Sequence, residues 1–100
     1  MFQIQKTTEF DAWLNKLKDF RANTQILRRI ERIRNGNFGD HKSIGSKILE
    51  LRITYGPGYR IYYTMRENII VLLLIGGDKS TQKADIQKAK DLLQSIGDNT

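Results

Sequence analysis

The chain has 100 residues, a length that suits one packed domain over 1–100 and excludes a second. Hydrophobic residues make up 39% and charged residues 28%, so we expect a globular rather than a disordered protein. The absence of cysteine excludes disulfides and thiolate metal sites, and the single histidine, His41, cannot form a zinc site by itself. The net charge of +6 favours an anionic partner, with nucleic acid ahead of an acidic protein or a membrane surface.

Neither a signal peptide nor a membrane span is expected. The N-terminus lacks a long apolar run, and the apolar stretch over 69–75 is far shorter than the roughly 20 residues that a membrane helix needs. We interpret 69–75 as a strand inside a sheet, covered on both faces. A cytoplasmic protein with no membrane partner is the expectation.

The first twenty residues predict a strand and a helix. Residues 2–5 alternate apolar and polar side chains, which indicates a short strand near a sheet edge. Apolar side chains then recur at steps of three and four over 10–20. Thr8 precedes this stripe and can cap the helix. The bulky Trp13 belongs to the stripe and is interpreted as core packing.

A second helix is expected between a cap at Asn23 or Thr24 and a stop at Gly36. Its outer surface is strongly basic, and three interpretations stay open. The surface can be a solvated face in which Glu31 pairs with neighbouring arginines, which is favoured modestly; it can contact phosphates; or it can dock an acidic partner. The basic residues of this surface are Arg28, Arg29, Arg32 and Arg34.

The segment 35–46 is rich in glycine, asparagine and serine and is expected to be a loop. It brings His41, Lys42 and Lys47 towards the sheet that follows. A lone loop histidine is more often exposed than functional, so His41 stays outside the candidate catalytic set.

Two runs of alternating character flank Gly56-Pro57-Gly58 and predict a β-hairpin, with Pro57 and Gly58 at the second and third positions of a type II turn. One face of the hairpin is apolar. The other is the candidate site, and it carries Glu50, Arg52 and Thr54 from the first strand and Arg60, Tyr62, Thr64 and Arg66 from the second.

After a tight turn at Glu67 and Asn68 comes the apolar strand, and then a helix from about Thr81 to Ser95 that Gly97 closes. The glycine-rich segment 76–81 lacks the spacing of a nucleotide-binding loop. It is either a phosphate cradle made by free amide groups and Lys79 or an ordinary turn into the helix, capped by Ser80 or Thr81. The fold class is α+β, in the order β-α-α-β-β-β-α.

The order of motifs resembles the addiction-module killer proteins, HigB-type toxins of the RelE/ParE superfamily. The resemblance runs from about Thr8 to Leu93. It implies a RelE-like fold in which a helical hairpin covers a mainly antiparallel four-stranded sheet. The motifs that carry it are Trp13-Leu14-x-x-Leu17, Arg28-x-Ile30-Glu31-Arg32-Ile33, Gly36-Asn37-Phe38-Gly39-Asp40, Glu50-Leu51-Arg52-Ile53, Gly56-Pro57-Gly58-Tyr59-Arg60-Ile61-Tyr62 and Gly76-Gly77-Asp78-Lys79-Ser80-Thr81-Gln82.

The resemblance also implies a type II toxin that inhibits translation as a metal-independent, ribosome-dependent endoribonuclease acting on mRNA. In this interpretation Arg60 and Lys79 stabilise the phosphorane charge, and Glu50 is the candidate base. Arg52 orients Glu50 or grips the scaffold, and Tyr62 is a possible donor on the same face. The expected RNA-binding residues are Arg28, Arg32, Lys42, Lys47 and Arg66.

No metal or other cofactor is expected, because the sequence assembles no carboxylate cluster suited to a divalent ion. The expected partners are a cognate antitoxin, the ribosome and mRNA. Two alternatives belong to other classes: a ParE-like, non-catalytic inhibitor of DNA gyrase, and a plain antitoxin- or nucleic-acid-binding module.

Overall fold

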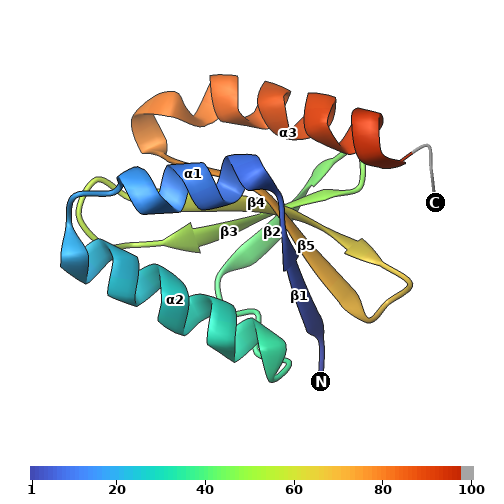
Figure 1. Ribbon diagram of the computed structural model, residues 1–100, viewed down its shortest axis with the longest axis horizontal. Coiled ribbons are helices and arrows are strands. Elements are labelled where there is room, and N and C mark those ends of the chain that lie inside the picture. Colours follow the sequence, from blue (N-terminus) through green and yellow to red (C-terminus); the bar gives the residue numbers. More distant parts are fainter. Residues whose placement is uncertain (98–100) are drawn as a thin grey trace.

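The computed structural model describes residues 1–97, and the domain expected over 1–100 therefore extends past the described residues by 98–100. The chain forms a five-stranded sheet with helices on both faces (Figure 1). Its elements in order are β1 (Gln3–Lys6), α1 (Thr8–Lys16), α2 (Phe20–Arg34), β2 (His41–Gly45), β3 (Ile48–Ile53), β4 (Tyr59–Arg66), β5 (Ile70–Asp78), the short 3-10 turn η1 (Lys79–Thr81) and α3 (Gln82–Gly97).

The strand order across the sheet is β1-β5-β4-β3-β2. β1 runs parallel to β5, and all other neighbouring strands are antiparallel, so the prediction of an α+β fold with a mainly antiparallel sheet is confirmed. β1 is an edge strand and β5 lies inside the sheet, which confirms both expectations from the apolar pattern.

The prediction of four strands was wrong by one, because 41–45 is not loop. This segment forms β2, which pairs with β3 at the second edge of the sheet. Its side chains are almost all exposed, so an edge strand of this kind carries no buried alternation that would reveal it in the sequence.

Both predicted helix starts move towards the N-terminus. The Thr7 hydroxyl, rather than Thr8, accepts the Phe10 amide at 2.9 Å and caps α1. Asp19 caps α2 by accepting the amides of Arg21 and Ala22, so the expected caps at 23 and 24 lie inside the helix. Aspartate is as good an N-cap as asparagine or threonine, and the sequence offered all three within six residues.

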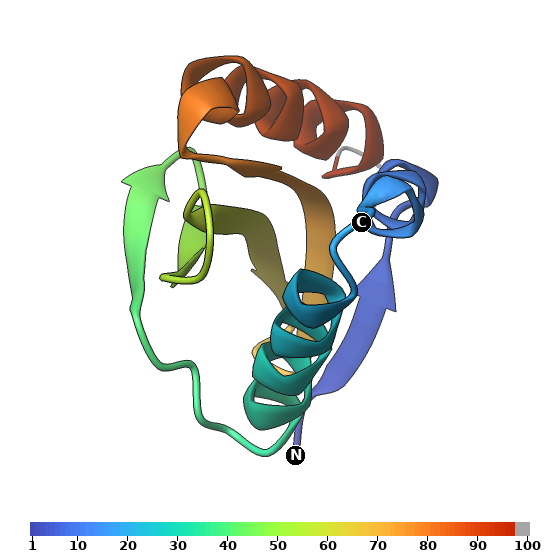
Figure 2. The same ribbon diagram turned by 90° about the vertical axis from the view of Figure 1, so that its left-hand side faces the viewer.

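Two apolar cores lie on opposite faces of the sheet. Figure 2 shows α2 and α3 on opposite sides of the sheet. The larger core joins α1 and α2 to one face, and the smaller joins α3 to the other. Alternation along the strands divides their side chains between these cores. Leu51, Ile61 and Leu73 face the helical hairpin, whereas Ile48, Tyr62 and Leu74 face α3.

The turn between β3 and β4 starts one residue earlier than predicted. The Gly58 amide donates to the Tyr55 carbonyl at 3.1 Å, which makes Gly56 the second turn residue and Pro57 the third. Gly56 has φ of 57° and Gly58 has φ of 81°, so glycine suits both positions. The next turn lies at Glu67 and Asn68 as predicted, and both residues have positive φ.

Candidate nucleotide-binding face

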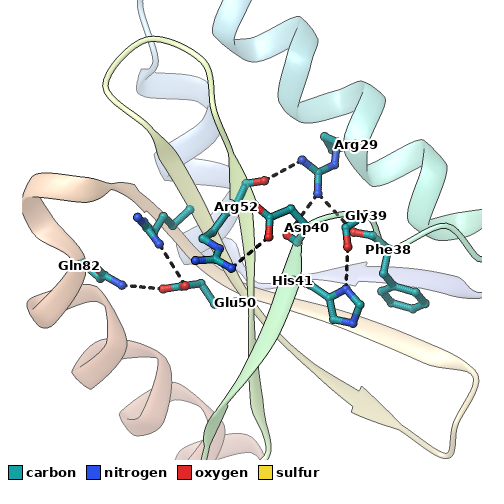
Figure 3. A network of polar contacts seen from close by, with 9 residues as sticks. Arg29, Phe38, Gly39, Asp40, His41, Glu50, Arg52 and Gln82 are labelled. Carbon is teal, nitrogen blue, oxygen red and sulfur yellow. Dashed lines mark hydrogen bonds and ion pairs between the residues drawn. The ribbon is translucent and has the colours of Figure 1, made fainter.

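A buried carboxylate lies at the centre of the polar face between the sheet and the start of α3. Glu50 has no exposed surface. One of its oxygens accepts the guanidinium of Arg60 at 3.1 Å, and the other accepts the Tyr62 hydroxyl at 3.2 Å and the Gln82 amide at 2.8 Å. Figure 3 shows Glu50 between the strands and the helix. Glu50 therefore holds together two strands and α3 while it fixes Arg60.

The sequence explains why these groups meet. Glu50 and Tyr62 are paired residues of β3 and β4, so alternation sends both side chains to the face that α3 covers. Burial, and next to it the charge of Glu50, raises the pKa of Tyr62 well above its usual value. Tyr62 is consequently a neutral hydroxyl donor at physiological pH. Sequence patterning identified Glu50, Arg60 and Tyr62 as one face, but it missed Gln82.

A second arginine lies next to Arg60 on the same face. Arg52 and Arg60 are paired across β3 and β4. The guanidinium of Arg52 forms an ion pair with Asp40 at 3.1 Å, and the Arg52 amide donates to the Asp40 carbonyl at 2.9 Å. Each arginine thus has its own carboxylate. The side chain of Arg52 is 35% exposed and that of its partner Asp40 is 51% exposed. The side chain of Arg60 is only 15% exposed and that of Glu50 is 0%, so Arg52 is the more accessible of the two arginines.

Arg29 of α2 ties this face to the helical hairpin, and here the sequence interpretation was wrong. It placed Arg29 on the outer basic surface. Instead its guanidinium donates to the carbonyls of Arg52 at 2.7 Å and of Phe38 at 3.3 Å, with a longer contact to that of Asp40 at 3.5 Å (Figure 3). Burial, and next to it the neighbouring Arg32, lowers the pKa of Arg29 from its ordinary value. Arg29 fixes the segment that presents Asp40 to Arg52.

The glycine pair before α3 is required for packing. A β-carbon on Gly76 would overlap the ring of Trp13, and one on Gly77 would overlap the carboxylate of Asp85. The side chains of Trp13 and Asp85 therefore fill the space beside the two glycines, where the sequence interpretation had allowed a phosphate to approach the backbone. Asp78 caps the turn by accepting the Ser80 amide at 2.8 Å, and not Ser80 or Thr81 as expected. Its hydrogen bonds to Ser80, chiefly that of the side chain, lower the pKa of Asp78.

Lys79 is exposed at the end of β5, where its β-carbon lies beside Gly58 of the β3–β4 turn. Arg60 pairs with Gly77 and Tyr59 with Asp78, so Lys79 follows immediately after the part of the sheet that carries Arg60. Lys79 has no ion-pair partner within residues 1–97.

The five predicted RNA-binding residues are spread over the molecule. Lys42 is paired with Glu50 and so shares the face of the site, and the exposed Lys47 follows at the turn into β3. Arg28 and Arg32 are exposed on α2, on the other side of the sheet. Arg66 lies at the far end of β4, roughly 20 Å along the strand from Arg60.

The chemistry that this face offers is recognition of a phosphate group. Two guanidinium groups on neighbouring strands present planar sets of donors that match phosphate oxygens, and a lysine stands at the rim. Over residues 1–97 no three histidine, aspartate or glutamate side chains gather as metal ligands would. None of the helices in this range is long and apolar enough to cross a membrane.

A family model and a curated relative each match most of the chain. Residues 12–94 match the model of a family described as phage-derived protein Gp49-like. An uncharacterized protein of Haemophilus influenzae is 53% identical over 95 residues, which cover 95% of this chain and 96% of that protein.

Solved structures of E. coli RelE share the fold at low sequence identity. The free arginine-to-alanine double mutant of RelE has a TM-score of 0.70 at 14% identity, covering 95% of this chain and 97% of that one. The isolated RelE toxin has a TM-score of 0.65 at 14% identity, with coverages of 87% and 98%. The intact RelBE toxin-antitoxin complex matches with a TM-score of 0.63 at 15% identity, with coverages of 78% and 96%.

Proposed function

The chain belongs to the phage-derived Gp49-like family, and from this premise we propose that it is the toxin of a toxin-antitoxin pair and cleaves mRNA on the ribosome. The similarity in fold to RelE, which is described as a toxin, supports the first part of the proposal. The second part rests on the candidate site. HigB-type toxins, which the sequence motifs resemble, serve as the functional model for this proposal.

The observation that carries the proposal is the pair of guanidinium groups of Arg52 and Arg60. The two residues face each other across β3 and β4, and each is held by its own carboxylate. A guanidinium has five N–H donors, so each arginine keeps donors beside those that its carboxylate accepts, and these match the oxygens of a phosphate. An RNA backbone supplies such phosphates.

Cleavage without an added nucleophile proceeds through the RNA itself. The ribose 2′-oxygen attacks the adjacent phosphorus, a bond from O2′ to phosphorus forms, and the bond from phosphorus to O5′ breaks. Water takes the 2′-hydroxyl proton and water gives a proton to the leaving O5′, so the products are a 2′,3′-cyclic phosphate and a 5′-hydroxyl. Arg60 and Lys79 are assigned to the negative charge that develops on the phosphoryl oxygens. Arg52, which is more exposed, is assigned to grip the RNA backbone.

The burial of Glu50 changes the role that we assign to it. Both of its oxygens are occupied, and it has no exposed surface, so it cannot touch RNA in this conformation. Glu50 is therefore assigned to hold Arg60 in position. For Glu50 to take the 2′-hydroxyl proton, as the sequence interpretation expected, the Gln82 amide would first have to leave the Glu50 carboxylate. Tyr62 has no exposed surface either, and its hydroxyl supports Glu50 rather than the substrate.

The basic residues outside the centre extend the proposed RNA surface. Lys42 and Lys47 lie beside the site and suit phosphates on either side of the cleaved bond. Arg28, Arg32 and Arg66 lie elsewhere and suit contacts with ribosomal RNA. A cognate antitoxin is the proposed protein partner, because a free toxin of this activity would arrest its host.

The proposal is tested by adding the purified chain to a translating bacterial extract and mapping RNA 5′ ends. We expect new ends inside coding regions, which disappear when initiation is blocked and when Arg60 is replaced by alanine. An unchanged pattern of ends would refute cleavage. Circular dichroism shows whether the Arg60→Ala chain is folded before the comparison is made.

One observation favours a second candidate, a ParE-like inhibitor of DNA gyrase that does not cleave RNA. The carboxylate nearest to Arg60 is occupied by three donors, which leaves it unfit as a base. A gyrase supercoiling assay distinguishes the two. Inhibition of supercoiling together with intact mRNA would establish this candidate, and unimpaired supercoiling at high concentration of the chain would remove it.

A further inference from the structure

A second carboxylate lies on the face of the sheet that carries Arg60. Asp85 belongs to the first turn of α3, and its Oδ2 atom lies so close to Gly77 that a β-carbon on this glycine would overlap it. Gly77 of β5 is paired with Arg60 of β4. Neighbouring strands of a sheet are about 5 Å apart, so the Asp85 carboxylate lies about one strand spacing from the backbone of Arg60.

The hydroxyl of Tyr62 gives a second indication that Asp85 belongs to this site. Tyr62 lies two residues after Arg60 on β4, and its hydroxyl donates to Glu50 at 3.2 Å. Burial and then Glu50 raise the pKa of Tyr62, the negative charge of Asp85 adds to this increase, and the positive charge of Arg60 opposes it. The charges of Asp85 and Arg60 therefore both act on the same hydroxyl, beside Glu50.

The two carboxylates differ in their capacity to accept a proton from a substrate. Glu50 has no exposed surface, and three donors occupy its oxygens. Asp85 is half-buried, and within residues 1–97 its side chain accepts only the Thr81 hydroxyl, at Oδ2 and 2.5 Å. The Oδ1 atom of Asp85 has no partner in that range and is open to solvent, and the carboxylate forms no ion pair there. Of the two carboxylates, Asp85 is therefore the one that a substrate can reach.

We propose that Asp85 is the general base of this site and takes the 2′-hydroxyl proton in place of water, an inference that rests on the proposed cleavage of RNA. Oδ1 accepts the proton while O2′ forms its bond to phosphorus and the bond from phosphorus to O5′ breaks. The leaving O5′ takes a proton from water, and Asp85 afterwards releases its proton to solvent. The positive charges of Arg60 and Lys79 offset the repulsion between the Asp85 carboxylate and the phosphate.

The test is single-turnover cleavage on ribosomes programmed with a defined mRNA, for the unchanged chain, Asp85→Asn and the control Asp91→Asn. Asparagine keeps the shape of the side chain and an oxygen for the Thr81 hydroxyl, but it cannot take the proton. We expect Asp85→Asn to lower the rate by about 10² or more, which is the usual effect of losing a general base. Asp91 is an exposed carboxylate further along α3 that accepts the Gln87 amide, so Asp91→Asn is expected to leave the rate unchanged.

Chemical rescue separates a base from a carboxylate that only supports the fold. Asp85→Ala removes the carboxylate and leaves room for a small one, so sodium formate is expected to restore part of its rate, whereas sodium chloride at the same concentration is not. Formate is expected to leave Arg60→Ala inactive.

Two results would overturn the role of Asp85 alone: equal rates for the unchanged chain and Asp85→Asn, or an Asp85→Ala rate that formate does not raise, with circular dichroism showing each variant folded. Absence of cleavage by the unchanged chain would overturn the proposed function together with this inference, so the two failures are distinguishable.

Discussion

Glu50 shows how one buried residue fixes several others. An ionised carboxylate without exposure is costly to bury unless charged and polar donors surround it, and this one has Arg60, Tyr62 and Gln82. The same contacts restrict Arg60 to one place on the sheet. A restrained guanidinium loses less freedom when it binds phosphate than a mobile one does, which favours recognition.

Gly77 is the residue whose small size matters most to the start of α3. We expect Gly77→Ala to destabilise the chain by about 1–3 kcal/mol, because the new methyl group overlaps the carboxylate of Asp85. Urea unfolding measures the loss. In an Asp85→Ala background the same substitution is expected to cost less, and an equal cost in both backgrounds would show that the overlap with Asp85 is not the cause.

Three buried tyrosines, Tyr59, Tyr62 and Tyr63, have a raised pKa and predict instability at alkaline pH. Burial raises the pKa of Tyr63 to about 12, and burial together with Glu50 raises that of Tyr62 further, whereas both ionise near 10 in the unfolded chain. A tyrosine with a higher pKa in the folded chain than in the unfolded chain contributes its full stabilisation of the fold below pH 10. This contribution is lost as the pH rises through the pKa of the folded chain.

We therefore expect the urea midpoint to fall between pH 10 and pH 12. Tyr63→Phe is expected to make the fall shallower, because one of the three tyrosines with a raised pKa is gone. A midpoint that stays constant over this range would contradict the burial of these hydroxyls. Tyr55→Phe serves as the control, since that side chain is only half-buried.

At the scale of elements, α2 supports the functional strands through Arg29. Its planar guanidinium reaches several carbonyls at once, which a lysine ammonium cannot do in the same geometry. We expect Arg29→Lys to destabilise the chain by about 1–2 kcal/mol and to increase hydrogen exchange in 38–41. Arg28→Lys, an exposed neighbour on the same helix, is expected to change neither. Unchanged exchange in Arg29→Lys would show that Arg29 does not hold that segment.

The elements that the sequence predicted are those with a strong apolar period. β3, β4 and β5 follow from alternation and from an apolar run, and the prediction that Glu50, Arg60 and Tyr62 share one face of the hairpin is confirmed. Thr54, which was placed on the same face, lies beyond the end of β3. β2 was missed because its exposed side chains have no buried alternation, and its role comes from backbone pairing with β3. Arg29 was misplaced for a related reason. The spacing of residues along α2 does not show that residues 38–40, which follow the helix, fold back against Arg29.

At the scale of the whole molecule, the sheet separates two surfaces. Arg52 and Arg60 lie on the face shared with α3, and a pocket lined by Phe38, Leu49 and Tyr63 lies on the face that α1 and α2 cover. The basic residues are distributed over both sides, so net charge alone did not locate a site. The hydrogen bond from the Gln82 amide to Glu50 links α3 to the sheet and joins residues 32 positions apart, and no local pattern in the sequence indicates such a contact.

The central claim is that the face containing Arg60 cleaves mRNA, and single-turnover cleavage on ribosomes programmed with a defined mRNA tests it most directly. The rate is compared for the unchanged chain, Arg60→Ala and the control Lys90→Ala, which alters an exposed lysine of α3. We predict that Arg60→Ala lowers the rate by about 10² or more, as loss of a donor to a developing oxyanion does, and that Lys90→Ala leaves it unchanged. Equal rates for the unchanged chain and Arg60→Ala, both folded, would contradict the account.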